Sequence, residues 1–199
     1  MKKQFTDLLF GNIIKYIVEN TNQAVWVCSI SPYISQRGKI VVVCPRYADR
    51  EYGFNRWLNR VFRLASTLKV SVDFLSTPQT FRHVTEYIDI NKIATTTKHI
   101  EFADWNDFLK IANYIQPTDL VIITLPRNGG VSYKFNQESI PRQMAKNFEN
   151  YDFILIYPNE AEDNPEMMFS DDFDASLIGE GLNQLTKKAK SLTDVFRKK

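Results

Sequence analysis

Apolar residues along this chain alternate between short unbroken runs and helical spacing. Three apolar runs predict strands buried on both faces, at 39–44, 120–125 and 153–157, and the segment 70–75 predicts a further strand. A shorter run at 99–102 predicts another strand. One-sided apolar spacing predicts helices at 54–68, 81–88, 104–115 and 140–148, with Asp104 as an N-cap.

Strands that alternate with helices in this way predict an α/β fold. We expect a doubly wound, mainly parallel five-stranded sheet over residues 39–158, with right-handed crossovers. Ligands of such sheets bind beyond the carboxyl ends of the strands. Residues 31–38 are predicted to be a linker, and residues 159–199 an acidic linker followed by a C-terminal helix.

The first 30 residues contain a predicted helix at 5–18 and a predicted strand at 24–30. The run 153–157 is a short apolar edge whose unpaired N–H and C=O groups favour pairing with another strand. The segment 24–28 has a matching composition. We therefore expect these two strands to lie side by side, or one of them to pair with a second copy of the chain as a homodimer.

Composition and charge narrow the class of protein. The chain has 44% apolar residues, enough for a core, and its 25 basic and 23 acidic residues give a net charge of +2. Such a balance predicts no nucleic-acid partner. Cys28 and Cys44 lie in apolar runs and are predicted to be buried, reduced thiols, as in a cytosolic protein. No apolar run approaches the roughly 20 residues of a membrane-spanning helix.

The loop after the strand at 120–125 is the candidate binding site. A glycine-bearing turn that leads to a helix can present N–H groups to an anion. The candidate residues are Arg127, Asn128, Gly129, Gly130 and Ser132, with Arg46 facing the same crevice. They predict a site for a small anion or a cyclic nucleotide. The alternative is a glycine turn with a solvated arginine and no ligand.

Other residues indicate no catalysis. His83 and His99 have no His, Cys or carboxylate neighbour at metal-binding spacing along the chain, so we expect no metal. Ser132 lies in no nucleophile motif, and no Ser/His or Cys/His arrangement can be assembled. The aromatic residues lack the spacing of an RNA-binding signature. We therefore do not expect an enzyme.

The order of elements over residues 39–158 resembles the universal stress protein domain, a fold similar to adenine nucleotide alpha hydrolases. Its nucleotide-binding members carry Gly-x2-Gly-x9-Gly-Ser/Thr after the fourth strand. Here Ile140 and Pro141 stand at the closing Gly-Ser, and proline has no backbone N–H. Cys44-Pro45-Arg46 stands where those relatives place an Asp. The resemblance therefore implies weak or absent ATP binding and no cofactor.

The opening "LLFGNIIKYIVENTNQAVWVC" is similar to the end of such a domain, with Gly11-Asn12 in place of its Gly-Ser. Residues 1–30 would then be the last helix and strand of a preceding domain. Tandem domains of this kind, and stretches such as "GFNRWLNRVFRLASTL" and "DLVIITLPRNGGVSYKFNQESIPRQMAKNFENYDFILIYP", resemble the cytoplasmic tails of bacterial cation:proton antiporters.

This resemblance implies a non-catalytic regulatory or assembly domain at the cytoplasmic face of the bacterial inner membrane. Its partner would be the transmembrane antiporter domain of the same polypeptide. The alternative is a freestanding, nucleotide-binding universal stress protein. The opening segment argues against that alternative, because a freestanding protein is not expected to begin with the last helix of another domain.

Overall fold

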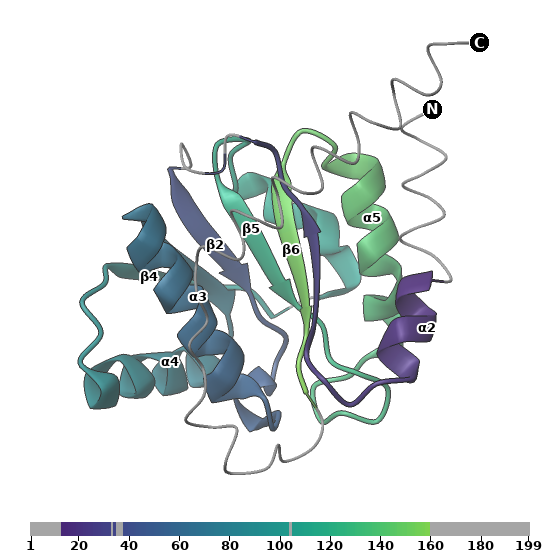
Figure 1. The fold of residues 1–199 in the computed structure, drawn as a ribbon, viewed down its shortest axis with the longest axis horizontal. Coiled ribbons are helices and arrows are strands. Elements are labelled where there is room, and N and C mark those ends of the chain that lie inside the picture. The colour runs from purple at the N-terminus through teal and green to yellow at the C-terminus, as the bar shows by residue number, and fades with distance from the viewer. Residues whose placement is uncertain (1–12, 33, 35–37, 104, 160–199) are drawn as a thin grey trace, which may run out of the picture. The chain divides into compact units, whose positions relative to one another are not determined.

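The computed structural model describes residues 13–32, 34, 38–103 and 105–159 (Figure 1). The chain divides into two compact units, residues 1–161 and 162–199, and every described residue belongs to the first. The predictions for Gly11-Asn12, for Asp104 and for the acidic linker and C-terminal helix after residue 159 lie outside the described residues.

Six strands form a single sheet in the order β1-β6-β5-β2-β3-β4. All neighbouring strands are parallel except β1 and β6, which are antiparallel. The predicted α/β class with a mainly parallel sheet is therefore confirmed, with five strands inside residues 39–158 and a sixth from the N-terminal segment. The strands are β1 (Val25–Ser29), β2 (Lys39–Val43), β3 (Ser71–Ser76), β4 (Thr97–Glu101), β5 (Leu120–Thr124) and β6 (Asp152–Tyr157).

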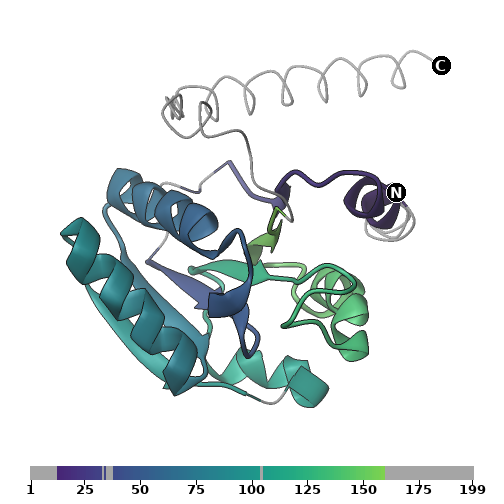
Figure 2. The same cartoon turned by 90° about the horizontal axis from the view of Figure 1, so that it is seen from below.

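Helices cover both faces of the sheet, as Figure 2 shows from below. The apolar sides of α3 and α4 pack on one face, and those of η4 and α5 pack on the other. Every residue of β5 is buried, which explains its unbroken apolar sequence. The helical elements are α2 (Ile14–Glu19), η3 (Ala48–Arg50), α3 (Phe54–Leu68), α4 (Pro78–Asn91), η4 (Trp105–Asn113), η5 (Phe135–Ser139) and α5 (Ile140–Asn147).

Two helices differ from their predictions. The helix predicted at 81–88 begins earlier, because the Thr77 side chain accepts a hydrogen bond from the Thr80 N–H and Pro78 occupies the first turn. The segment predicted as a helix at 104–115 is a 3-10 helix, interrupted at Asp107 by non-helical backbone angles. Its apolar residues Trp105, Phe108 and Ile111 are nevertheless buried as the spacing predicted.

The predicted pairing of the opening segment with the last strand is confirmed. Val25 lies opposite Tyr157 and Ser29 opposite Phe153 in the antiparallel β1–β6 pair. Beyond this pair, Ser31 donates hydrogen bonds from its N–H and its hydroxyl to the buried Asp152 carboxylate, at 2.8 and 3.0 Å. That β1 is the last strand of a preceding domain remains a prediction.

Candidate functional site

The topology predicts a crevice between β2 and β5. From β2 the chain adds β3 and β4 on one side, and then returns to add β5 and β6 on the other. The parallel strands β2 and β5 are neighbours, and the helices that follow them, α3 and α5, cover opposite faces of the sheet. Ligands of doubly wound sheets bind outside the carboxyl ends of such a strand pair. The loops at this edge are residues 44–53 after β2 and residues 125–134 after β5.

The glycine loop after β5 is folded as a tight turn. Gly130 donates its N–H to the Arg127 carbonyl at 3.0 Å, and Gly129 has a φ of 94°, the left-handed conformation that such a turn requires. The next turn is closed by the Tyr133 N–H and the Gly130 carbonyl, at 3.1 Å. The N–H of Gly130 is therefore engaged within the loop and does not point to a ligand.

The carboxylate of Glu51 occupies the position where the loop would hold an anion. Its Oε1 accepts hydrogen bonds from the N–H and the hydroxyl of the buried Ser132, at 2.8 and 2.5 Å. A Cβ placed on Gly130 would lie 2.8 and 3.1 Å from the two Glu51 oxygens, so the loop approaches the carboxylate closely. Glu51 brings a negative charge and uses both donors of Ser132. An incoming phosphate would have to displace it.

Arg127 is buried, and its guanidinium is engaged by the chain's own backbone. Its guanidinium donates to backbone carbonyls of three segments: Pro158 after β6 at 2.9 Å, Val18 at the end of α2, and Thr21 and Gln23 before β1. The five N–H groups of an arginine suit several acceptors at once. Arg127 thus attaches the N-terminal segment to the carboxyl edge of the sheet.

Residues after β6 close the same edge from a third direction. A Cβ placed on Gly53 would lie 2.5 Å from Asn159 Oδ1, 3.0 Å from Pro158 Cβ and 3.1 Å from the Asn159 N. Asn159 is itself buried. The loops that follow β2, β5 and β6 therefore contact one another through Glu51, Arg127 and Gly53 at this edge of the sheet.

The remaining candidate residues do not converge on this loop. The exposed Arg46 stacks on the Tyr47 ring, with its Cζ 4.7 Å from the ring centroid, and Arg50 does the same at 4.8 Å. Within the described part of the chain, no hydrogen bond or ion pair joins Arg46 to residues 127–132. Asn128 is exposed, and the space around Gly129 is open. The structure thus brings Gly130 and Ser132 together around Glu51, while Arg46 contacts the Tyr47 ring.

Ile140 and Pro141 are core residues. Both are buried at the start of α5, and the Ile140 side chain packs on the sheet with Met144. They supply no hydroxyl toward the loop, and proline supplies no N–H. Ile140 and Pro141 were predicted to remove two phosphate donors from the loop, and their burial in the core is consistent with that prediction.

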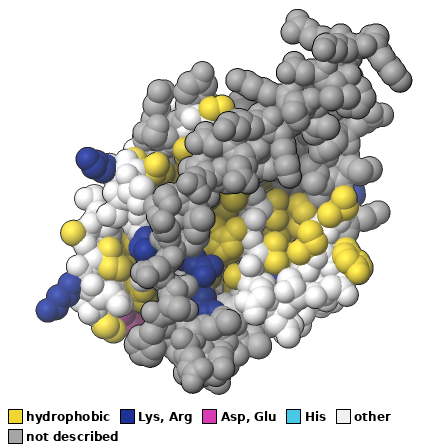
Figure 3. All heavy atoms as spheres, in the orientation of Figure 1, with side chains coloured by type: hydrophobic (Ala, Val, Ile, Leu, Met, Phe, Trp, Pro, Cys, Tyr) yellow, Lys and Arg dark blue, Asp and Glu magenta, His cyan; other side chains and the backbone are white. Residues whose placement is uncertain are grey.

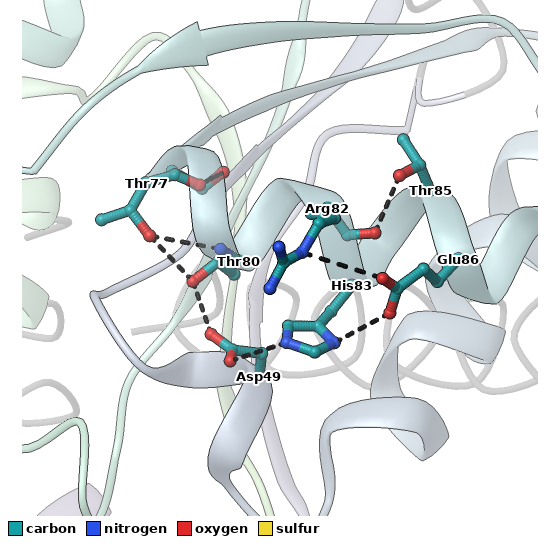
Figure 4. Close-up of polar contacts among 8 residues, drawn as sticks. Asp49, Thr77, Thr80, Arg82, His83, Thr85 and Glu86 are labelled. Atoms are coloured by element: carbon teal, nitrogen blue, oxygen red, sulfur yellow. Dashed lines mark hydrogen bonds and ion pairs between the residues drawn. The ribbon is translucent and has the colours of Figure 1, made fainter.

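A polar cluster between η3, which follows β2, and α4, which follows β3, was not predicted (Figure 4). The side chain of Asp49, only 2% exposed, accepts a hydrogen bond from the Thr80 hydroxyl at 2.7 Å and faces His83 Nε2 at 3.5 Å. The other ring nitrogen of His83 lies 3.1 Å from Glu86. Glu86 follows His83 by three residues, which corrects the prediction that His83 has no carboxylate neighbour at such a spacing along the chain. Asp49, by contrast, comes from η3. The cluster fastens η3 to the first turns of α4.

His99 is also a structural residue. Its ring stacks on Phe81 with 4.5 Å between centroids, and its Nε2 lies 3.0 Å from the Ser76 carbonyl. No group of three or more His, Cys, Asp or Glu among the described residues is arranged to hold a metal ion. The same residues include no helix that is both long enough and apolar enough to cross a membrane.

The two cysteines differ, which corrects the prediction that both are buried. Cys44 is fully buried at the end of β2, whereas Cys28 is exposed because β1 is an edge strand. Burial raises the pKa of the Cys44 thiol to about 12. The nearby Asp49 adds to this rise, while a hydrogen bond with Thr124 opposes it. Cys44 is therefore an unreactive thiol near neutral pH.

We expect one thiol per native chain to react with a thiol-specific disulfide reagent at pH 8, and both thiols to react in denaturant. The reactive thiol is Cys28, because it is exposed whereas Cys44 is buried. Burial raises the pKa of both thiols, that of Cys44 to about 12, so Cys28 should react slowly at pH 8 and Cys44 not at all. The released chromophore measures the stoichiometry. Cys28→Ser should abolish the reaction of the native chain. Rapid labelling of native Cys28→Ser would contradict the burial of Cys44.

No protein-family model matches this chain, and a search of curated proteins finds no match. A function is therefore inferred from the geometry of the site and from the sequence resemblance described above.

Proposed function

We propose that this chain is a non-catalytic regulatory and assembly module of the universal stress protein type, carried by a bacterial cation:proton antiporter. The observation that supports it best is the occupied crevice, in which Glu51 uses the donors that a phosphate would need. The hydrogen bonds of Arg127 and Glu51 at this edge of the sheet hold segments of the chain together. A module of this kind acts through its surfaces and not through a bound substrate.

The proposed partner is the transmembrane antiporter domain of the same polypeptide, at the cytoplasmic face of the inner membrane. The resemblance of the opening segment and of residues 39–158 to a tandem antiporter tail supports this partner. Regulation would require the module to have different affinities for two states of the transporter. Such a difference can come from pairing of domains as well as from a ligand.

Extending the reading frame upstream tests the antiporter proposal. A series of apolar helices, each about 20 residues long, should precede this chain. An upstream region that encodes a separate soluble protein, or none, would contradict it. It would favour the alternative, a freestanding universal stress protein, although the Glu51 carboxylate also argues against the nucleotide binding expected of that alternative.

ATP should bind no more tightly than millimolar, which corresponds to about −4 kcal/mol. The Glu51 carboxylate repels phosphate and already accepts both Ser132 hydrogen bonds. Isothermal titration of the purified chain measures the affinity. Glu51→Ala removes the competing charge and tests whether the carboxylate is the cause, while Glu51→Gln keeps an acceptor of the same size.

A control variant separates binding in the loop from binding elsewhere. In Glu51→Ala combined with Gly130→Val, the new side chain fills the space that the carboxylate vacates. Any ATP binding that Glu51→Ala gains should be lost in this double variant. Micromolar binding by the unmodified chain that Gly130→Val abolishes would show that the loop is a nucleotide site after all.

A further inference from the structure

Two loops at the carboxyl edge of the sheet lie side by side and expose apolar side chains. The loop after β2 is joined to the loop after β5 by the hydrogen bonds between Glu51 and Ser132. Tyr52 follows Glu51 and is 47% exposed. Val131 precedes Ser132 and is 61% exposed, and Phe135, which begins η5, is 79% exposed. Large apolar groups that gather on neighbouring loops in this way mark a contact surface.

The charged residues of the same loops leave a positive charge on the outside. The exposed basic residues are Arg46, Arg50 and Lys134. The carboxylates of the loop after β2 are held by the protein itself, because the Asp49 side chain is buried and Glu51 bonds to Ser132. The exposed Glu138 in η5 accepts a hydrogen bond from the Tyr133 hydroxyl. The apolar side chains are therefore flanked by more basic than acidic groups.

Two of the basic residues are held close together. Arg46 and Arg50 both lie over the Tyr47 ring, with their Cζ atoms 4.7 and 4.8 Å from its centroid. Tyr47 has a φ of 69°, a left-handed backbone conformation that is uncommon for an aromatic residue. Neither arginine forms an ion pair with another described residue. Both guanidinium groups can therefore bind a phosphate group of a partner, which arginine does with paired N–H donors.

We propose that these residues form a lipid-contact surface, which binds the anionic headgroup layer of a membrane. The lipid-contact surface consists of Arg46, Arg50, Tyr52, Val131, Lys134 and Phe135. Its aromatic and aliphatic side chains enter the boundary between headgroups and acyl chains, where such side chains are favoured. Its basic side chains bond to lipid phosphates, and each Lys or Arg near an anionic surface strengthens binding about five-fold.

A lipid partner deepens the proposed function, because it gives the module a second contact at the cytoplasmic face of the membrane. The proposal rests on that function only for this location. Binding to vesicles does not require the transporter, so the two proposals fail separately. An upstream reading frame without apolar helices contradicts the antiporter parent alone, whereas the experiments below address the lipid-contact surface alone.

A second group of exposed apolar side chains lies elsewhere and serves as a comparison. Tyr16 and Ile17 of α2 are 68% and 45% exposed. Apolar side chains are visible on the β6, β1 and α2 side of the molecule in Figure 3. The charges on α2 are balanced, since Lys15 and Glu19 form an ion pair at 3.7 Å. Without an excess of basic groups, this helix is not expected to select anionic lipid.

Co-sedimentation of the full chain with lipid vesicles tests the proposal. The chain should bind vesicles made of equal parts of phosphatidylglycerol and phosphatidylethanolamine, and should not bind vesicles of phosphatidylcholine alone. Binding should weaken as salt is added, because salt screens exposed charges. Inorganic phosphate, added at constant ionic strength, should not compete. This last measurement distinguishes a lipid surface from a site for a small anion.

Variants of the full chain assign the binding to this surface, since residues 160–199 contain further basic residues. Val131→Ser combined with Phe135→Ser removes the inserted groups and should weaken binding to the anionic vesicles at least about ten-fold. The matched controls are Ile90→Ser, at a residue of α4 that is also 79% exposed, and Tyr16→Ser on α2. Both controls should keep the affinity of the parent chain.

The arginine pair is tested in the same way. Arg46→Gln combined with Arg50→Gln should weaken binding about 25-fold and reduce its dependence on salt. Lys92→Gln combined with Lys98→Gln removes the same charge from exposed residues outside the two loops, and should weaken binding far less.

An environment-sensitive fluorophore locates the contact. Attached to Phe135→Cys in a Cys28→Ser background, its emission should shift to the blue when anionic vesicles are added. The same label on Ile90→Cys should not shift. Cys44 is buried and does not take the label.

Four results would overturn the proposal. Absence of binding to anionic vesicles, or equal binding to phosphatidylcholine, would leave these side chains for a protein partner. Equal affinities of the loop variants and the parent would place the contact elsewhere in the chain. Competition by inorganic phosphate would assign the arginines to a small anion. A label at residue 135 that does not shift would show that the loop stays outside the headgroup layer.

Discussion

Replacing Arg127 with alanine should lower the free energy of unfolding by about 3 kcal/mol or more. The guanidinium is buried and donates to carbonyls of Pro158, Val18, Thr21 and Gln23, which lose their charged donor together. Urea unfolding followed by circular dichroism measures the change. Arg127→Lys should recover only part of it, because an ammonium group cannot serve acceptors arranged around a planar guanidinium.

Hydrogen exchange localises this effect. In Arg127→Ala the amides of β1 should exchange faster than those of β2 and β5, because β1 and α2 lose their attachment to the sheet edge. Arg142→Ala, on the exposed side of α5, is the matched control and should change the unfolding free energy by no more than about 0.5 kcal/mol. Unaltered exchange in β1 would show that Arg127 does not hold the N-terminal segment.

Substituting Gly53 with alanine should cost about 1 to 3 kcal/mol. The added methyl group would lie 3.0 Å from Pro158 Cβ and 3.1 Å from the backbone N of Asn159. The side-chain oxygen of Asn159, at 2.5 Å, can rotate away, but the backbone after β6 cannot move without disturbing its contact with Arg127. The melting temperature reports the loss.

Gly38→Ala provides the matched glycine substitution. Its new methyl group would meet the side chains of Asp119 and Thr118 at 3.7 and 3.9 Å, which are ordinary van der Waals distances. We expect this variant to lie within about 1 kcal/mol of the parent, since alanine also lowers the entropy of the unfolded chain. Equal melting temperatures for Gly38→Ala and Gly53→Ala would mean that the loops at the carboxyl edge can shift to accommodate the added methyl group at little cost in stability.

The sequence was sufficient to predict the sheet, because burial on both faces leaves an apolar run that can be read directly. The segment 120–125 is predicted from its composition, and β5 occupies residues 120–124 with every residue buried. The pairing of β1 with β6 was predictable for a related reason. Both segments are short and apolar, and each needs a neighbour to satisfy its backbone groups.

The contents of the crevice were not predictable in the same way. Arg127 close to two glycines suggested an anion site, but it donates to the Pro158 carbonyl and to three carbonyls more than 100 positions earlier in the chain. Glu51 and Ser132 are 81 positions apart, and their contact depends on how two loops fold after their strands are in place. Gly53 and Gly130 were the available signal, since both permit a close approach that a side chain would prevent.

The partnership of β1 and β6 also bears on how the chain folds during synthesis. Ser31 and Asp152, which join the ends of these strands, are 121 positions apart. The ribosome therefore produces β1 long before β6, and β1 must wait while the parallel strands between them assemble. Contacts of such long range form late and slow the completion of the sheet. During that interval the apolar β1 is a segment on which chaperones can act, or through which nascent chains can associate.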